Sequence, residues 1–338
     1  MFYCGLDLGK KSSHFCIMNE KRKIVEQGQV RNKIVDLTKR FGDLPPMKIV
    51  VEASTKSFWV ADRLEEMEHE VVVVDPGRTR AIGAARIKHD KLDAKILAEL
   101  CVADLLAQVD RPNEQQRLER LAIISRDALV RSRARLVMMI RSILDSEGIE
   151  LKSCATDAFA DAVSKINTPL PPEMKRSIEP ALAAIQSLNE QIENCDKQIK
   201  EAMSEDKDVK RLLTIPGVGV IVAAHFLVAM RNPKRFESGR QLGAYLGLVP
   251  SLYQSGKTFR RGSITKRGNK QARWALCVAA NALLRTKRDT AIRRWGLGLV
   301  EKLGRKKAIV AIARKLASVM WSMLKNNTDF EARIALAK

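Results

Sequence analysis

The first hundred residues alternate short apolar segments with amphipathic ones, a pattern typical of strands and helices in turn. Three β-rich segments come first, and helical and strand-like segments then alternate. We predict strands at residues 2–8, 14–19, 23–30, 47–51 and 70–74, and helices at residues 35–41, 57–68, 79–87 and 91–106. This order predicts an α/β domain over residues 1–108, with the three strands and the later strands in one sheet.

The next hundred residues follow a helical period instead. From residue 113 to residue 147, apolar or small residues recur at steps of three and four, which predicts one long amphipathic helix. A proline-containing break follows, and a second periodic stretch runs from Ile178 to Ile199. Two long helices joined by a connector favour an antiparallel coiled-coil arm over residues 109–208, an element that commonly serves as a spacer or in oligomerisation.

Residues 209–338 are predicted to form an all-α domain, with helices at residues 220–230, 241–246, 271–284, 290–303 and 306–324. A loop containing glycine and serine is expected at residues 249–268. The segment Ile215-Pro216-Gly217-Val218-Gly219 before an apolar helix is typical of a helix-hairpin-helix. Gly217 and Gly219 could allow N–H groups at the helix start to face a phosphate, or could serve only a tight turn.

Charge separates the two halves of the chain. Residues 210–338 hold 27 lysines and arginines against 5 acidic residues, a net charge of +22, whereas residues 1–209 have a net charge of −1. So segregated an excess attracts a polyanion, and nucleic acid binds such a surface through release of counterions. A solvated basic face without a partner is the alternative.

The remaining composition excludes several classes of protein. The six cysteines are scattered, without a spacing typical of zinc sites or of a disulfide framework, so reduced thiols in the cytoplasm are expected. We find no pattern of a signal peptide and no uncharged apolar stretch approaching ~18–20 residues, so no membrane association is expected.

Four acidic residues mark candidate chemistry. Asp7 lies near the end of the first predicted strand, Glu52 directly follows the buried strand 47–51, and Asp90 and Asp93 stand three apart at a helix start. The predicted layout can bring all four to one edge of the sheet. Since a carboxylate buried alone is costly, a divalent cation is the expected partner, and two Mg²⁺ ions suit phosphoryl transfer. Ordinary charges at strand ends and a helix cap are the alternative.

Three motifs around these acids resemble a known family. Gly5-Leu6-Asp7, Val51-Glu52-Ala53 and the segment 88–94 resemble the DEDD signature of bacterial transposases of the "insertion sequence one-ten" family, which is related to a pilin-gene invertase. The resemblance implies a RuvC-like RNase H fold whose four acids bind magnesium. A phosphate loop of the actin and sugar-kinase ATPases also resembles the first motif, but those enzymes need a second copy of the domain, which this sequence lacks.

The C-terminal part resembles the same family. Its motifs are Leu246-Gly247-Leu248-Val249-Pro250, Ser255-Gly256-Lys257 and residues 262–269. The resemblance implies a nucleophilic serine, which falls on Ser255, with Ser251 and Ser263 as rivals because Lys257 stands where the family has glycine. The residues expected to hold phosphates are Lys257, Arg260, Arg261, Lys266 and Arg267.

These observations predict a DNA recombinase of insertion-sequence type that acts in the bacterial cytoplasm, beside the nucleoid. The resemblance implies that a structured RNA guides it, and joining two duplexes favours a homodimer or homotetramer. A metal-dependent junction-resolving nuclease, with water in place of Ser255, is one alternative. A nucleic-acid-binding protein without catalytic activity is the other.

Overall fold

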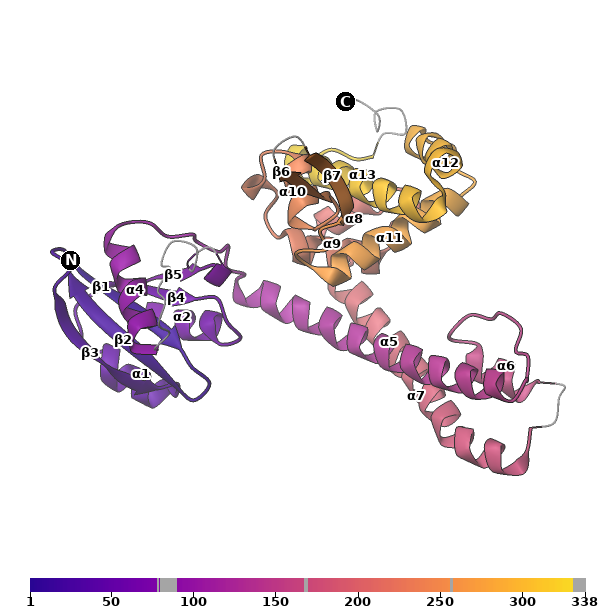
Figure 1. Cartoon of the computed structure of the whole chain (residues 1–338), viewed down its shortest axis with the longest axis horizontal. Helices are drawn as coiled ribbons and strands as arrows, with labels where there is room; N and C mark the ends of the chain where they lie inside the picture. Colours follow the sequence, from indigo (N-terminus) through magenta and orange to yellow (C-terminus); the bar gives the residue numbers. More distant parts are fainter. Residues whose placement is uncertain (78, 80–89, 167–169, 256–257, 331–338) are drawn as a thin grey trace. The chain divides into compact units, whose positions relative to one another are not determined.

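The computed structural model describes residues 1–77, 79, 90–166, 170–255 and 258–330 (Figure 1). Within this part, the side chains of Asp90, Lys91, Ser255, Thr258 and Arg261 are not described. The chain forms two compact units, Met1–Pro112 and Asn113–Lys338, and each is considered by itself. The second unit contains both the predicted arm and the predicted basic domain.

The first unit is built on a mixed five-stranded sheet in the order β3-β2-β1-β4-β5 (Figure 1). The strands β1, β2 and β3 pair antiparallel, whereas β1 with β4 and β4 with β5 pair parallel. The strands are β1 (Phe2–Leu8), β2 (Ser12–Asn19), β3 (Ile24–Arg31), β4 (Lys48–Glu52) and β5 (Glu70–Val74). All five predicted strands are confirmed; the apolar run of β4 is typical of a central strand, whereas β3 is an edge strand with mostly exposed residues.

Helices cover both faces of this sheet. On one face, Leu6 and Ile49 pack with Phe41 and Leu64 of the first two helices. On the other face, Leu97 packs against the valines of β4 and β5. The helices are α1 (Ile34–Phe41), α2 (Ser57–Glu65) and α4 (Asp90–Val102). The predicted helix 79–87 lies, except for Thr79, outside the described residues.

Two long helices form an arm in the second unit, as the periodic pattern predicted. They are α5 (Glu114–Ser146) and α7 (Pro172–Ala202), and the short α6 (Phe159–Ser164) lies between them in the chain. Asn113 and Gln116 form a capping box that starts α5. The pairs Arg126–Asp196 and Arg133–Asn189, at 2.6 and 2.7 Å, show that the two helices run antiparallel.

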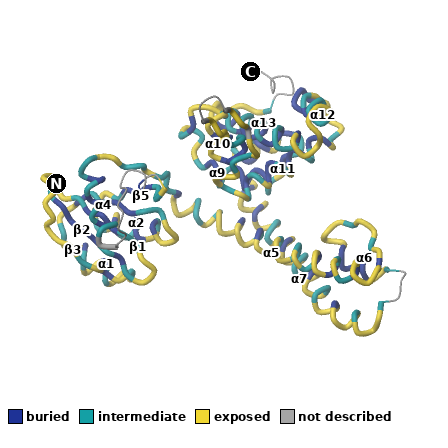
Figure 2. The backbone as a smooth tube through the Cα atoms, viewed as in Figure 1, coloured by how far each residue is buried: buried dark blue, intermediate teal, exposed yellow. Residues whose placement is uncertain are grey.

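The arm joins the basic domain through a buried polar contact. Asp127 of α5 lies 3.3 Å from Nε2 of His225, and both residues are buried. His225 belongs to the helix α9 (Val220–Met230), and Arg126, beside Asp127, bonds Asp196 of α7. Figure 2 shows the contrast between the arm, which exposes much of its surface, and the helices that follow, which enclose a buried core.

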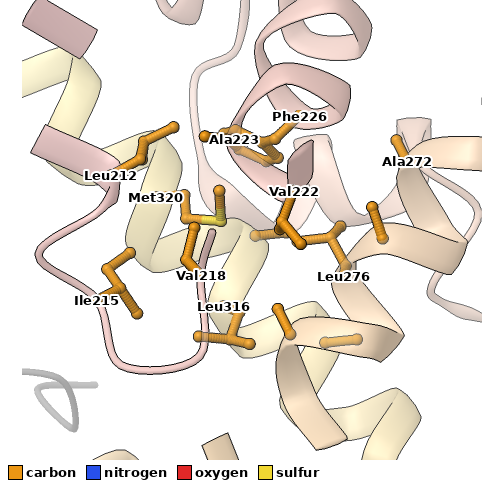
Figure 3. Packing of buried hydrophobic residues seen from close by; sticks show 14 of the residues in the cluster. Leu212, Ile215, Val218, Val222, Ala223, Phe226, Ala272, Leu276, Leu316 and Met320 are labelled. Atoms are coloured by element: carbon orange, nitrogen blue, oxygen red, sulfur yellow. The ribbon is translucent and has the colours of Figure 1, made fainter. Parts of the chain in front are cut away.

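The basic domain is largely helical. Figure 3 shows side chains of the turn between α8 and α9 meeting those of α9, α11 and α13 in its core. The helices are α8 (Lys207–Leu212), α9 (Val220–Met230), α10 (Gly239–Tyr245), α11 (Lys270–Arg285), α12 (Ala291–Leu303) and α13 (Arg305–Asn326), with a 3₁₀ turn at Pro233–Arg235. In the described part of the chain, no helix is both long and apolar enough to cross a membrane.

One element corrects the all-α prediction for this domain. The expected loop 249–268 contains an antiparallel hairpin of β6 (Pro250–Ser255) and β7 (Thr258–Ile264). Tyr253 pairs with Arg260 and Ser255 pairs with Thr258. The segment was read as a loop because its glycines and serines are frequent in loops, whereas a two-stranded hairpin needs no apolar face to form its hydrogen-bond ladder.

Candidate active site

Asp7 and Glu52 lie side by side at one edge of the sheet. The parallel pairing of β1 and β4 runs to Leu6 and Val51, and the two acids directly follow these partners. Neighbouring strands lie about 4.8 Å apart. The structure therefore brings these two predicted site residues together at the carboxyl ends of adjacent strands, where both are partly exposed.

The same strands determine which face the acids occupy. A side chain at Gly5 would meet the carbonyl oxygen of Ala94 at 2.0 Å, so α4 lies directly on the backbone of β1. Val50 packs with Leu97 of α4. Because alternate residues of a strand face the same side, Asp7 and Glu52 share the face that α4 covers.

The direction of α4 places its acidic start at the same edge. Near its end, Sγ of Cys101 lies 4.0 Å from the carbonyl oxygen of Lys48, at the beginning of β4, whereas Ala94 lies over Gly5. The helix thus runs opposite to β1 and β4. Its first turn, from Asp90 to Asp93, points toward the carboxyl ends of the strands.

The acidic side chains at this edge are of the type that binds a hard cation, since carboxylate oxygens are the ligands that Mg²⁺ prefers. Among the described side chains, no group of three or more histidine, cysteine, aspartate or glutamate residues is arranged to hold a metal. Asp90, whose side chain is not described, stands outside that statement. The backbone brings the four acids to one edge, and their ligation of a metal stays a prediction.

The sequence reasoning did not include His14 in this site. His14 is the register partner of Asp7 across β1 and β2, so the two share one face of the sheet. Its side chain is partly exposed. A histidine beside a carboxylate can carry or transfer a proton near neutral pH. In the sequence, His14 is marked only by its position in a strand, two residues after the first turn. That position alone indicates no particular function.

The candidate serines lie on the hairpin of the basic domain. Ser255 is the last residue of β6, at the end of the hairpin ladder. The hydroxyl of Ser251 donates to the carbonyl of Ser263 at 3.0 Å, so these two rivals bridge the strands at the hairpin base. Gly256 and Lys257 lie outside the described residues.

Two glycines of the family motifs hold the neighbouring turns together. A side chain at Gly247 would meet the carbonyl oxygen of Arg267 at 2.1 Å, and one at Gly268 would meet that of Tyr245 at 2.1 Å. Both glycines also have a positive φ, +70° and +78°. The turns 245–247 and 266–268 therefore interlock at backbone contact, which fixes the base of the hairpin.

Arg273, which the sequence reasoning missed, ties these turns to α11. Its Nη1 donates to the carbonyl oxygens of Leu246, Arg267 and Gly268 at 3.0, 2.8 and 3.1 Å. Burial lowers the pKa of the Arg273 guanidinium, which nevertheless stays charged. Arg273 thereby positions the segment that carries the predicted phosphate contacts.

The predicted basic residues differ in how they lie. Arg260, Lys266 and Arg267 are exposed, whereas Lys257 lies outside the described residues and only the backbone of Arg261 is described. Tyr253, paired with Arg260, is 67% exposed. An exposed aromatic side chain beside cations is typical of surfaces on which bases stack, a feature that the sequence reasoning also overlooked.

Gly217 and Gly219 have different surroundings. Gly217 has a φ of +88°, and a side chain there would meet the backbone nitrogen of Leu283 at 2.7 Å, so this glycine serves the packing of the turn against α11. Gly219 is the exposed N-cap of α9. The N–H groups that follow Gly219 are thus placed at an accessible helix start, while its contact with nucleic acid stays a prediction.

Comparisons with known proteins identify the class. Residues 209–295 match the model of the transposase family IS116/IS110/IS902, and residues 4–148 match the DEDD transposase model of IS110 type. Both matched regions therefore indicate a transposase. The chain belongs to the IS110/IS116/IS902 family, which confirms the resemblance drawn from its motifs.

Relatives match over nearly the full chain. A probable family 20 transposase of Pseudomonas aeruginosa is 29% identical, covering 96% of this chain and 97% of the relative. The transposase for insertion sequence element IS1328 of Yersinia enterocolitica is 27% identical, with shares of 96% and 97%. A pilin gene-inverting protein of Moraxella bovis is 26% identical, with shares of 85% and 83%.

Proposed function

We propose that this insertion-sequence transposase cuts and rejoins DNA with a magnesium-binding carboxylate cluster and a serine nucleophile. The observation that carries the proposal is the meeting of Asp7, Glu52 and the first turn of α4 at one sheet edge. A basic domain with a net charge of +22 over residues 210–338 supports DNA as the substrate.

We also propose a more specific fold for three regions of the chain. The strand order β3-β2-β1-β4-β5, with three antiparallel strands followed by parallel ones, supports an RNase H-like domain of RuvC type. The seven-residue spacing of buried Ile178, Ile185, Ile192 and Ile199 supports a coiled-coil arm. The succession of α8, a glycine-containing turn and α9 supports a helix-hairpin-helix.

In this proposal Asp7, Glu52, Asp90 and Asp93 hold one or two Mg²⁺ ions. Bound magnesium supplies charge stabilisation for phosphoryl transfer and lowers the proton affinity of an oxygen nucleophile. The chain's own contribution is to fix the acids by strand register and by the contact of α4 with Gly5. His14, opposite Asp7, is placed to exchange a proton at this edge.

The serine then forms a covalent link to DNA. The hydroxyl oxygen of Ser255 forms a bond with the scissile phosphorus, the bond from phosphorus to O3′ breaks, and O3′ leaves with a proton as a free hydroxyl. The serine proton passes to a base or water. Because the new ester keeps the phosphoryl bond, a 3′ hydroxyl can later reverse the step and reseal a strand without ATP.

The proposed function also predicts further copies of this chain and a guide RNA as binding partners. The arm exposes apolar side chains at Leu118, Leu121 and Met138, which are 54%, 59% and 70% exposed, and these support assembly into a homodimer or homotetramer. A structured guide RNA, implied by the resemblance, suits the basic surface equally well. We place the protein in the cytoplasm beside the nucleoid.

The test is to trap the serine–DNA link. Purified protein is incubated with Mg²⁺ and labelled DNA that carries the element ends, then denatured. We expect a protein-linked label with the unaltered chain and none with Ser255→Ala, while Ser251→Ala keeps it. Cleavage without any linked label, unaffected by Ser255→Ala, would instead favour a nuclease that uses water.

A further inference from the structure

An open groove lies at the base of the hairpin, between it and the helices α12 and α13. Its volume is about 740 Å³, within the range of small-ligand sites, roughly 300–1,000 Å³. Pro250 and Ile264 form one side, Trp295 comes from α12, and Val310 and Ala311 from α13. None of these residues belongs to the carboxylate site or to the predicted phosphate contacts.

The charge along the groove has one sign. Four cations line it, all from α13, and no lining residue is acidic. In the described part of the chain, none of the four makes an ion pair with a carboxylate. The four are Lys306, Lys307, Arg314 and Lys315. Because elsewhere in the same domain arginines such as Arg294 do pair with acids, this row of unpaired cations favours a ligand that brings its own negative charge.

The apolar surface between the cations narrows the kind of ligand. A DNA duplex presents phosphates and base edges and keeps the faces of its bases inside the stack, so it offers no flat base face to Trp295. An unpaired strand exposes base faces, which stack on aromatic side chains, with its phosphates within reach of nearby lysines. The partly exposed Trp295 supplies such a surface.

We propose that this groove binds an unpaired stretch of DNA strand, with a base against Trp295 and Ala311 and with phosphates at Lys307 and Lys315. DNA rather than RNA is the committed ligand, because the hairpin whose base lines the groove carries Ser255, the proposed nucleophile on DNA, at the other end of its ladder. The inference deepens the proposed function and rests on it: a strand opened beside the cleavage point would be held here.

The test compares single and double strands on the full chain. Fluorescence anisotropy measures binding of a labelled 12-nucleotide oligodeoxythymidylate, of a 12-base-pair duplex and of an oligouridylate of equal length. Ala311→Phe fills the groove without changing charge, and Leu297→Phe, outside the groove on α12, is its control. We expect Ala311→Phe to weaken binding of the oligodeoxythymidylate about tenfold and to change duplex binding less than twofold.

Charge removal gives a second measurement. Lys307→Gln should weaken single-strand binding several-fold and flatten its dependence on salt by about 0.7 in the log–log slope. Lys302→Gln removes an exposed lysine that does not line the groove and should change the single-strand affinity and its salt slope much less.

Three results would overturn the inference. They are unchanged single-strand binding in both groove variants, equal losses on duplex and single strand, and a groove-dependent preference for oligouridylate. Each leaves the proposed function intact if the Ser255-dependent adduct still forms. Absence of that adduct in the unaltered chain would instead remove the proposed function, whatever the groove variants do.

Discussion

The sheet unit and the basic domain position their functional groups in opposite ways. In the sheet unit, two acids far apart in sequence meet because adjacent strands pair in a fixed register, and α4 rests on a glycine. In the basic domain, the cations lie on a hairpin, on turns and along one helix, where no single register gathers them. In the proposed function, the rigid sheet positions the groups that must converge on one phosphate, whereas contact with an extended polyanion needs only a row of charges.

The largest effect should come from removing one of the convergent acids. Asp7→Asn keeps the shape of the side chain and removes its charge, and a bound magnesium ion contributes several kcal/mol to phosphoryl transfer. We expect DNA cleavage to fall by about a hundredfold or more. Adduct formation on labelled DNA measures it, and Asp43→Asn, an exposed acid outside the site, is the control.

An unchanged cleavage rate in Asp7→Asn would show that this sheet edge holds no group needed for the reaction, and the contrast between the two regions would then be wrong. Binding of duplex DNA, measured in parallel, should stay within about twofold, since we expect the positive charge of the basic domain to dominate the affinity.

Next in size is the contact that positions α4. Gly5→Ala places a methyl group 2.0 Å from the carbonyl oxygen of Ala94, so the helix must shift. Overpacking of this kind costs about 1–3 kcal/mol of stability, and displacement of the first turn of α4 should also reduce cleavage. Thermal unfolding and adduct formation measure the two effects. Gly298→Ala, where a side chain meets nothing within 4 Å, should be neutral or slightly stabilising.

A smaller effect is expected from loosening the interlocked turns. Arg273→Gln removes the charged Nη1 group that donates to three carbonyl oxygens, and a hydrogen bond to a charged group contributes about 1.5–3 kcal/mol. We expect lower thermal stability and a several-fold weaker affinity for DNA, measured by anisotropy. Arg273→Lys keeps the charge but not the planar guanidinium. If it behaves like the unaltered chain, then charge rather than geometry positions these turns.

The last effect is absent at neutral pH and concerns the buried thiols of the sheet unit at alkaline pH. Burial raises the pKa of the thiols of Cys4 and Cys16, and that of Cys101 to about 12. Since these folded pKa values exceed the unfolded value of 9.0, stability is full below pH 9 and falls as the pH rises toward 12. For Cys101 the loss is at most about 1.4 kcal/mol per pH unit between pH 9 and 12.

Hydrogen exchange of the β1 and β4 amides, corrected for the intrinsic rate at each pH, measures this loss. Cys101→Ala should flatten the decline for the sheet unit. Equal declines in the two proteins would show that other groups, and not this thiol, control the alkaline limit.

Much of the fold follows from sequence periodicity, and the failures have physical causes. The strands at residues 2–8 and 70–74 and the helix around residues 113–147 were predicted almost to the residue, because their apolar periods are long or bounded by clear turns. The hairpin of β6 and β7 was missed because both of its faces expose side chains such as Leu252 and Tyr253. No alternation between buried and exposed positions marks it.

The part of the candidate site that depends on the strands could also be predicted. Acids at strand ends are visible in a sequence once the strands are, so Asp7 and Glu52 could be paired in advance. Backbone contacts are harder to predict: Gly5 lies within a predicted strand, which suggests a close approach of backbone, but the sequence does not show that α4 is the element that approaches it. Arg273 likewise gains its role only when the turns at residues 245–247 and 266–268 come together in space.

The parallel pairing of β1 with β4 also constrains how this gene can change. Deleting one residue between Tyr3 and Asp7 would turn the carboxylate to the opposite side of the sheet, among Leu6 and Phe41, while leaving every acid in the sequence. A copy with such a deletion would keep its recognisable motifs and lose its chemistry. Among decayed genomic copies, the count of residues within these two strands should therefore separate working elements from silent ones better than the presence of the four acids does.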